Sequence, residues 1–347
     1  MIIKLKKNKL IVLILVLILS ITSIIFLASY ANAQGEQESA STYIKWAELN
    51  VTQEALQDTM ELDIQTYDML RHISWIDSLA YLACKNGNDF SSYKSAQLDA
   101  LVLELGEIYT VDDLMQESEF YEYYKQIFTA MLGGMLSEFE REIPDGNGGI
   151  TTTSGYGLVA YSPIAEGFYY SHYDDFGNSR SYGYDRNHLG NDLLGSIGTP
   201  IIAVEGGVVE SIGWNQYGGW RIGIRSFDGL RSYYYAHLRQ DSPYRAGLEL
   251  GSVVKAGDVI GYMGMTGYST TENVNGMSVC HLHFGMQLIF DESQKEGVNQ
   301  IWVDVYELVK FLYQNRATVI KDSDSGEYYR MYDIIDYNYP IELQNFD

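Results

Sequence analysis

The chain has 347 residues and a formal net charge of -23, with 46% hydrophobic residues, 33 glycines and five prolines. This composition is typical of a globular protein rich in strands and turns, and the length suits two domains. The negative charge argues against nonspecific binding to nucleic-acid phosphates or to an anionic membrane surface, so we expect no nucleic-acid partner.

Residues 1–35 differ in kind from the rest of the chain. Their basic flank consists of Lys4, Lys6, Lys7 and Lys9. An apolar run from Leu10 to about Ala28 follows, and Ala31-Asn32-Ala33 ends the segment. The pattern is that of a secretory signal, but the run is also long enough to span a bilayer as a helix. A cleaved signal peptide and a retained membrane anchor both stay open. In either case we expect residues 36–347 to be extracytoplasmic, secreted or anchored at the membrane.

Residues 36–145 are predicted to form a helical domain of unknown role. Apolar residues recur at three- and four-residue steps from Val51, which predicts a first helix. Ser74-x-x-Asp77 indicates the start of a second helix that stops at Asn86-Gly87. Residues 97–105 form another, and Thr110-x-x-Asp113 opens the longest, which we expect to run to about Arg141. A protein partner of this domain is one hypothesis.

Residues 146–187 are predicted to be a linker and a lead-in. Pro144 to Gly149 is a run of turn-forming residues, which we interpret as a flexible linker. The segment that follows is rich in Tyr, Ser, Gly and Asp, and we expect it to cross the surface of the next domain. His172 in this segment is interpreted as a histidine that binds no metal. The two cysteines, Cys84 and Cys280, fall in different predicted domains and are expected to be free thiols.

Residues 188–316 are predicted to be a β domain. Short apolar runs separated by glycines suggest an antiparallel sandwich or a partly open barrel. Hairpins are expected around Glu205-Gly206-Gly207 and around Asp228-Gly229. An amphipathic helix over residues 303–313 closes the domain, and residues 317–347 form an acidic tail. The predicted fold class is therefore α+β: a signal or anchor helix, a helical domain, and an antiparallel β-sheet domain with a C-terminal helix.

Three histidine motifs in this β domain point to a zinc site. His281 and His283 share one face of a strand, because side chains alternate with period two. His188-x-x-x-Asp192 lies upstream, on a turn entering a strand. A catalytic zinc ion takes three protein ligands and leaves one position for water, and we interpret His188, Asp192 and His283 as those ligands. His281 suits a base for the water, and His237 a donor to the developing oxyanion.

These residues and their surroundings resemble the lysostaphin-type zinc endopeptidases. The resemblance covers roughly residues 185–290 and rests on five blocks: His188-x-x-x-Asp192, residues 198–209, Tyr235-Ala236-His237-Leu238, residues 261–267 and His281-Leu282-His283-Phe284. It implies a β-sheet groove with one zinc ion on His188, Asp192 and His283, and with His237 and His281 as the catalytic pair. It also implies that the substrate is a cross-bridge or stem peptide of bacterial peptidoglycan.

Two small departures from the family pattern leave all five residues in place. Asn191-Asp192-Leu193-Leu194 replaces the more usual alternation around the aspartate, and Cys280 stands where a small residue or proline is common.

The sequence thus predicts an exported, cell-wall-associated zinc metalloendopeptidase that hydrolyses peptidoglycan peptides. An alternative is a membrane-tethered scaffold or binding module without enzymatic activity. A third hypothesis is a latent enzyme whose groove is covered by residues 150–187, with Asn187 reaching the open position of the metal.

Overall fold

The computed structural model describes residues 43–106, 110–182, 184–297 and 299–339. The expected signal peptide or anchor over residues 1–35 lies outside these ranges. Every element discussed below lies in one compact unit, which begins at Lys45. Among the described residues, no helix combines the length and apolar character needed to cross a membrane.

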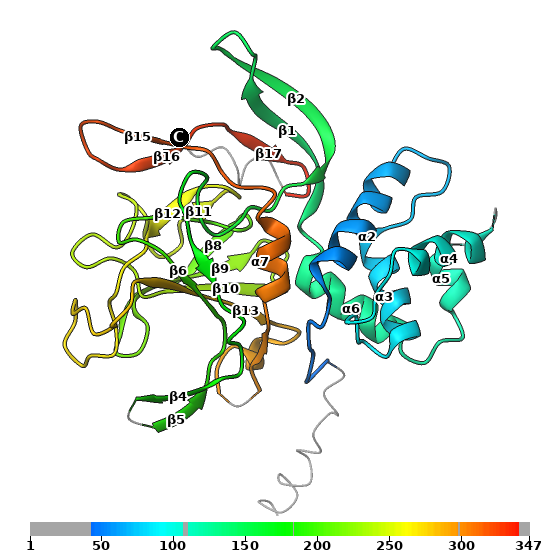
Figure 1. Cartoon of the computed structure of the whole chain (residues 1–347), viewed down its shortest axis with the longest axis horizontal. Helices are drawn as coiled ribbons and strands as arrows, with labels where there is room; N and C mark the ends of the chain where they lie inside the picture. Colours follow the sequence, from blue (N-terminus) through cyan, green and yellow to red (C-terminus); the bar gives the residue numbers. More distant parts are fainter. Residues whose placement is uncertain (1–42, 107–109, 183, 298, 340–347) are drawn as a thin grey trace, which may run out of the picture. The chain divides into compact units, whose positions relative to one another are not determined.

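Five helices form the N-terminal part of this unit (Figure 1). They are α2 (Gln53–Thr66), α3 (Trp75–Asn86), α4 (Ala96–Leu105), α5 (Val111–Met115) and α6 (Tyr121–Leu132). The predicted start signals are confirmed: the side chains of Ser74 and Thr110 accept hydrogen bonds from the amides of Asp77 and Asp113. Gly87 ends α3 with a positive φ of 63°, a left-handed conformation that glycine adopts without strain.

The single long helix expected from Thr110 to about Arg141 is wrong. The structure breaks it after Met115, restarts it at Tyr121 and ends it at Leu132. Gly133 and Gly134 follow, and a Cβ on Gly134 would lie within 2.5 Å of three other side chains, so only glycine fits this turn. Beyond it, residues 137–143 alternate acidic and other side chains, a period-two pattern that belongs to a strand.

A projecting β-hairpin therefore follows the helices (Figure 1). It consists of β1 (Leu136–Pro144) and β2 (Ile150–Leu158), and β17 (Ile334–Asp336) pairs with the other edge of β1. The run that we interpreted as a flexible linker is the turn of this hairpin, in which Asp145 Oδ1 accepts hydrogen bonds from the amides of Asn147 and Gly149. Part of the predicted acidic tail is thus a strand in the same sheet as β1.

The main sheet of the β domain has eight strands and is antiparallel, as predicted. Its order is β11-β8-β9-β10-β13-β6-β3, and β14 also pairs with β13. The strands are β3 (Ser171–His172), β6 (Asn191–Leu194), β8 (Gly207–Asn215), β9 (Gly219–Ser226), β10 (Arg231–Ala236), β11 (Val253–Val254), β13 (His281–Leu288) and β14 (Ile301–Val303). Buried residues of the central strands, such as Ile222, Tyr233 and Phe284, are part of the core.

Three two-stranded sheets and one short helix complete the domain. The sheets pair β4 (Ser179–Tyr182) with β5 (Tyr184–Asn187), β7 (Pro200–Ile202) with β12 (Val259–Tyr262), and β15 (Val319–Lys321) with β16 (Tyr328–Arg330); η1 (Glu292–Gln294) is a 3-10 helix. The hairpin around Asp228-Gly229 is confirmed as β9–β10. The hairpin around Glu205 is wrong, because β7 pairs with β12 and β8 pairs with β9.

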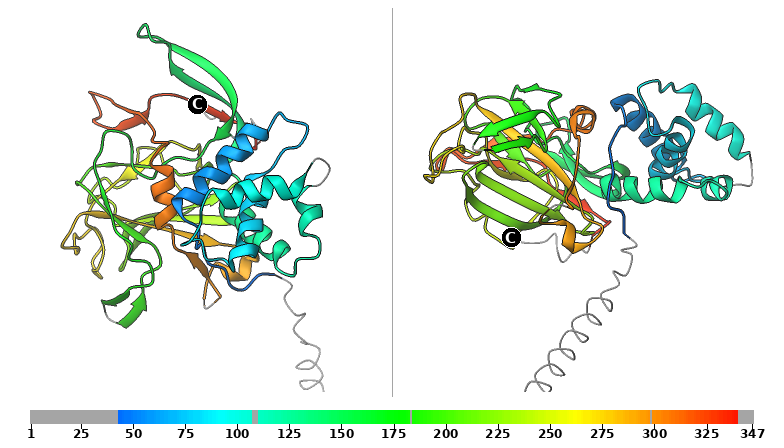
Figure 2. Two further views of the ribbon diagram at one scale, coloured as in Figure 1. Left: turned by 45° about the vertical axis from the view of Figure 1, so that its right-hand side comes forward. Right: turned by 90° about the horizontal axis from the view of Figure 1, so that it is seen from below.

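The predicted closing helix is present as α7 (Tyr306–Leu312) and faces the helical part of the chain (Figure 2). The rings of Trp75 and Phe311 lie 5.6 Å apart, and the amide of Gln53 donates to Glu307 Oε2 over 2.7 Å. An antiparallel β domain preceded by helices and followed by a C-terminal helix is therefore confirmed.

A buried ion pair also joins the helices to the sheet. Arg231 on β10 is fully buried and donates two 2.7 Å hydrogen bonds to the carboxylate of Glu205. The Nη1 of the same guanidinium donates to the carbonyl of Ala130 in α6 over 2.9 Å. Tyr233 and Tyr339 donate to Glu205 as well. Glu205 is thus a buried hub rather than an exposed turn residue, which is why the chain changes sheets there.

Glu205→Ala is expected to destabilise the protein by about 3 kcal/mol, because it removes the fully buried carboxylate partner of Arg231. Asp228, which lies 3.1 Å from Arg231 Nη2 and is partly exposed, replaces that partner only in part. Glu292→Ala is the matched control, since Glu292 pairs with Arg225 at the surface, and it should cost less than about 1 kcal/mol. Urea unfolding of both variants measures the difference. Equal losses would contradict the central place given to the Arg231–Glu205 pair.

Candidate metal centre and catalytic groove

Three of the predicted site residues converge on one point. His188 Nε2 lies 2.8 Å from His283 Nδ1 and 3.1 Å from Asp192 Oδ1, and His283 Nδ1 lies 3.2 Å from the same carboxylate oxygen. The structure therefore brings together one potential ligand atom from each of the residues that the sequence singled out.

The pairing of β6 with β13 creates this convergence. His283 stands directly opposite Asp192 in the antiparallel register, and His281 stands opposite Leu194 on the same face of the strand. His188 lies three residues before β6 and is held by a hydrogen bond from its amide to the Asn178 carbonyl, 2.9 Å away. His188 thus lies in the segment that enters the strand, as predicted for both residues, whereas Asp192 lies in the strand itself.

The two other histidines lie beside this point. His281 Nε2 is 3.8 Å from Asp192 Oδ1, and the rings of His237 and His281 have centroids 4.7 Å apart. His237 follows β10 with a φ of 60°, a left-handed conformation that is uncommon outside glycine and is often found at functional sites. Its amide donates to the Gly218 carbonyl over 2.7 Å, which holds the turn.

Backbone carbonyls select the tautomer of both rings. His237 Nδ1 lies 2.8 Å from the Thr266 carbonyl oxygen, and His281 Nδ1 lies 2.9 Å from that of Val279. A carbonyl only accepts, so each Nδ1 carries the proton and each Nε2 keeps a free lone pair. Both rings are thereby prepared to accept a proton at Nε2.

Two further residues, which the sequence analysis missed, surround the ligand atoms. Asp175 accepts from His188 Nδ1 through its backbone carbonyl at 3.0 Å, and its carboxylate pairs with Arg180 at 2.6 Å. The same Arg180 nitrogen lies 3.4 Å from Asp192 Oδ2. Partners of this kind orient metal ligands. No short spacing connects residues 175 and 180 to the three ligands, so only the folded segment that includes β4 and the residues before it reveals them.

The electrostatic field at the site is negative. Burial by itself would lower the pKa of His188, but hydrogen bonds to the carboxylates of Asp175 and Asp192 raise it to about 9. Burial opposes ionisation of Asp192, yet its hydrogen bonds to His188 and His283 hold the pKa of its carboxyl well below the usual range. Burial lowers the pKa of both His237 and His283, which favours their neutral forms.

These residues fit a zinc ion. Two imidazoles and one carboxylate are the donor set of many catalytic zinc sites. Tetrahedral bonds of about 2.1 Å would place the ligand atoms roughly 3.4 Å apart, close to the 2.8–3.2 Å seen here. The negative field that favours a proton on His188 equally favours a divalent cation in its place, and coordination would require the neutral imidazole.

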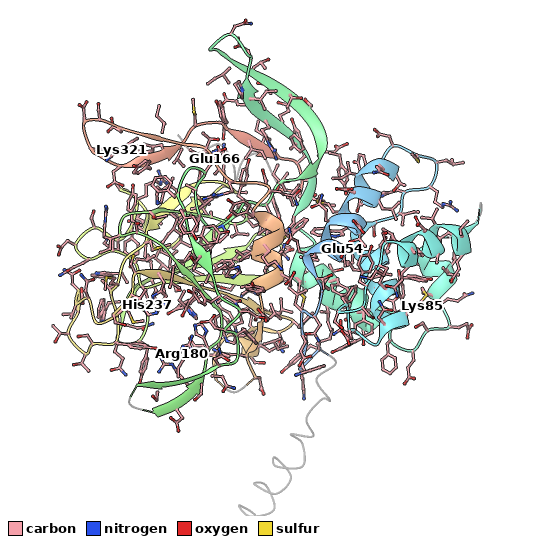
Figure 3. The ribbon with its side chains drawn as sticks, in the orientation of Figure 1. Glu54, Lys85, Glu166, Arg180, His237 and Lys321 are labelled. Carbon is pink, nitrogen blue, oxygen red and sulfur yellow. The ribbon has the colours of Figure 1, made fainter. Side chains whose placement is uncertain are left out.

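All five residues border a single groove. Its cavity of about 520 Å³ is lined by His188, Asp192, His237, His281 and His283 together with parts of β5, β8, β9, β10 and β13. Figure 3 labels Arg180 and His237, which lie on the same side of the β domain and border this cavity. Gly190 makes room for the site, since a Cβ there would lie 2.8 Å from two atoms of the His283 ring.

The remaining residues that the sequence analysis discussed lie outside the ligand group. His172 on β3 is half-buried against Tyr306, with ring centroids 4.5 Å apart, and its two buried ring nitrogens have no hydrogen-bond partner among the described residues. Both cysteines are free thiols, as predicted. Burial raises the pKa of Cys280 to about 11, so its thiol stays protonated beside the site.

The segment that carries this site is similar to a known family of peptidases. Residues 186–299 match peptidase family M23. The chain is 39% identical over 117 residues to L-Ala--D-Glu endopeptidase of Bacillus subtilis, a match that covers 34% of each chain. It is 41% identical over 98 residues to lysostaphin of Staphylococcus simulans, covering 28% of this chain and 17% of lysostaphin. The matched segments are therefore about a third or less of these relatives.

One solved structure resembles much more of the chain. It is a Ruminococcus gnavus protein that carries the name glycyl-glycine endopeptidase LytM, and it covers 81% of this chain and 94% of its own, with 25% identity and a TM-score of 0.53. The family match spans 114 of 347 residues (299 - 186 + 1). The likeness of fold therefore extends well beyond the segment that matches the family.

The wild-type protein is expected to bind one zinc ion per chain, and Asp192→Asn or His283→Ala should weaken binding at least tenfold, because each removes one of three ligands. His172→Phe is the matched control: it removes a half-buried histidine outside the ligand group and should still bind one zinc ion. Competition with a chromogenic chelator at pH 7.5 measures the affinities. Unchanged zinc binding in Asp192→Asn would exclude this ligand set.

His172 also predicts a pH-dependent stability. Burial lowers its pKa from 6.5 to about 4, so the unfolded chain binds the proton more readily and stability falls as the pH drops from 6.5 to 4. Relative to His172→Phe, the wild type should lose about 2 kcal/mol of unfolding free energy between pH 7 and pH 5. Urea unfolding at both pH values is the measurement, and parallel losses in both proteins would contradict the assignment.

Proposed function

We propose that this protein is an exported zinc endopeptidase that hydrolyses peptide bonds in bacterial peptidoglycan, a proposal supported by the match of residues 186–299 to peptidase family M23. The observation that carries the proposal is the convergence of His188, Asp192 and His283 beside two imidazoles that both present a free Nε2 to the same groove. This arrangement offers a cation site and a proton acceptor within reach of one bound peptide.

His188, Asp192 and His283 would hold the zinc ion, and the bound ion would polarise the substrate carbonyl and make the attacking water more acidic. Arg180 and Asp175 keep His188 and Asp192 oriented through the contacts described above. His281 Nε2 accepts the proton of the water as its oxygen bonds to the carbonyl carbon. The same proton then passes to the leaving amine as the C–N bond breaks.

His237 stabilises the oxyanion that forms when the water attacks the carbonyl. In its neutral form its Nε2 accepts, so it donates to the developing oxyanion only after taking up a proton. Burial lowers the pKa of His237, which makes such a protonated ring a ready proton donor. We therefore assign the transfer of the proton from water to the leaving amine to His281, and hydrogen-bond donation to the oxyanion to His237.

The names of the relatives support peptidoglycan as the substrate. The Bacillus subtilis relative is named for the L-Ala--D-Glu bond, and the Ruminococcus gnavus protein for a glycyl-glycine bond. Peptidoglycan peptides are thus the proposed substrate class. The lysine-flanked apolar run of residues 1–35 supports export to the cell wall, and a protein partner of the helical part remains a hypothesis.

A latent form is the alternative that has a specific observation in its favour. Arg180, Arg186 and Asn187 from the lead-in border the cavity beside the ligand atoms. A segment in this place is able to restrict access to the groove. Limited proteolysis of the purified protein tests this: a rise in activity after cleavage between residues 176 and 186 supports latency, and unchanged activity opposes it. A scaffold without activity would bind zinc and sacculi but release no peptides.

Zinc-dependent release of peptides from purified sacculi is the expected activity. His281→Ala and His237→Ala should each reduce the rate about a hundredfold or more while zinc stays bound, because each removes a proton-transfer group and no ligand. Loss of turbidity measures the rate of hydrolysis, and mass spectrometry of the released peptides identifies the bond that is cut. His72→Gln is the control histidine, since it lies in the helical part and should retain full activity. Release that persists in His281→Ala, or without zinc, would contradict the mechanism.

A further inference from the structure

The floor of the groove carries an arginine that the reaction does not use. Arg221 on β9 borders the cavity, and its Nε is buried without a hydrogen-bond partner within the described ranges. Its Nη1 donates to Ser211 Oγ over 2.9 Å, a neutral partner. No described carboxylate forms an ion pair with its guanidinium. Arg221 as a whole is half-buried, but a buried donor such as its Nε is costly to leave unpaired unless a ligand supplies an acceptor.

The sheet register places this arginine in one row with the zinc ligands. Asp192 stands opposite His283, and His283 stands opposite Ala236. Tyr235 stands opposite Ile222, so the next pair in the register is Ala236 with Arg221. The four residues border the same cavity. The side chain of Ala236 is only a methyl group, so it leaves space in the groove between His283 and Arg221. A substrate chain can lie there across the strands.

Nearby charges leave Arg221 available. Glu210 is the carboxylate on the adjacent strand β8, and it is already paired with Lys295 at 2.5 Å and hydrogen-bonded by Ser232 at 2.6 Å. Burial raises the pKa of Tyr234, while the charges of Arg221 and Arg186 oppose that rise, so both guanidinium groups act on this hydroxyl. A positive field thus surrounds the phenol at this end of the groove.

We propose that Arg221, supported by the charge of Arg186, binds a free carboxylate of the substrate, which makes acidic peptides the substrate class rather than neutral glycine chains. The proposal rests on the proposed peptidase function. Two inter-strand spacings separate β9 from β13, about 10 Å, and an extended peptide covers this distance in about three residues. The carboxylate therefore lies about three residues from the bond that is cut. Arg–carboxylate pairs are charge-assisted and directional.

Binding to the metal-free protein tests the subsite separately from hydrolysis. The probes are three forms of the peptide L-Ala–D-Glu–L-Lys–D-Ala, with D-Glu linked through its side chain: one with only the D-Glu α-carboxylate free, one with only the C-terminal carboxylate free, and one with both as amides. Isothermal titration calorimetry compares them. The wild type should bind one carboxylate form at least tenfold more tightly than the double amide.

Arg221→Gln should abolish this preference while changing the affinity for the double amide less than about twofold. Arg221→Lys should restore part of it, because the charge returns without the planar fork. Lys321→Gln, which removes an exposed lysine far from the cavity lining, is the control for net charge and should keep the full preference. Thermal unfolding of each variant shows that it folds.

The outcomes separate the two proposals. No preference in the wild type, or the same preference in Arg221→Gln, overturns the carboxylate subsite even if zinc-dependent hydrolysis is found. A preference that requires Arg221, in a protein that never hydrolyses sacculi with zinc, supports the subsite and rejects the peptidase. The probe that binds more tightly, with either the C-terminal or the D-Glu carboxylate free, identifies the carboxylate that Arg221 binds.

Discussion

The antiparallel register of β6 and β13 is the constraint on which the site depends. It sets His283 opposite Asp192 and, through the period of two, sets His281 on the same face. A slip by one residue would turn both histidines to the opposite face of the sheet. β10 on the other side of β13 fixes the register further, with Ala236 opposite His283. The position of each potential ligand is therefore a property of the whole sheet.

The groove and the helices are tied together by buried polar contacts rather than separated by a linker. Arg231 reaches from β10 to Glu205 and to the carbonyl of Ala130 in α6, and Tyr339 closes the same cluster from the C-terminal segment. Removing Glu205 would leave the buried Arg231 charge with only the partly exposed Asp228 carboxylate, 3.1 Å away, as an ion-pair partner. The Ruminococcus gnavus structure resembles 81% of the chain, which agrees with a helical part and a β domain that fold as one arrangement.

Local signals predicted a large part of the fold. Ser74 and Thr110 marked helix starts, Asp228-Gly229 marked a hairpin, and the period-two pair His281 and His283 marked one strand face. The predictions failed where distant contacts decide. Glu205 sits in a sequence that looks like a hairpin turn, yet a buried Arg231 26 residues away draws it inside.

In the site, too, residues with a local sequence signal were predicted, and residues placed by distant contacts were missed. The five histidine and aspartate residues stood out by type and spacing, and the structure brings all five to one groove. The roles of ligand and catalytic residue remain proposals that the zinc and activity measurements decide. Arg180 and Arg221 had no signal in the sequence, because only folded strands bring them to the groove, and Asp175 is found only through its contacts with Arg180 and His188.

The charge of the groove explains how so acidic a chain is able to take up an acidic peptide. The net charge is -23, but charges separated by more than about 8–10 Å are largely screened at physiological salt. The cavity itself is lined by four cations and three anions: Arg180, Arg186, Arg221 and Lys295 against Asp192, Glu210 and Glu296. A bound divalent ion would make the balance more positive still. The field is negative at the three ligand atoms, whereas a peptide carboxylate beside Arg221 and Arg186 meets positive charges, opposite in sign to the net charge of the protein.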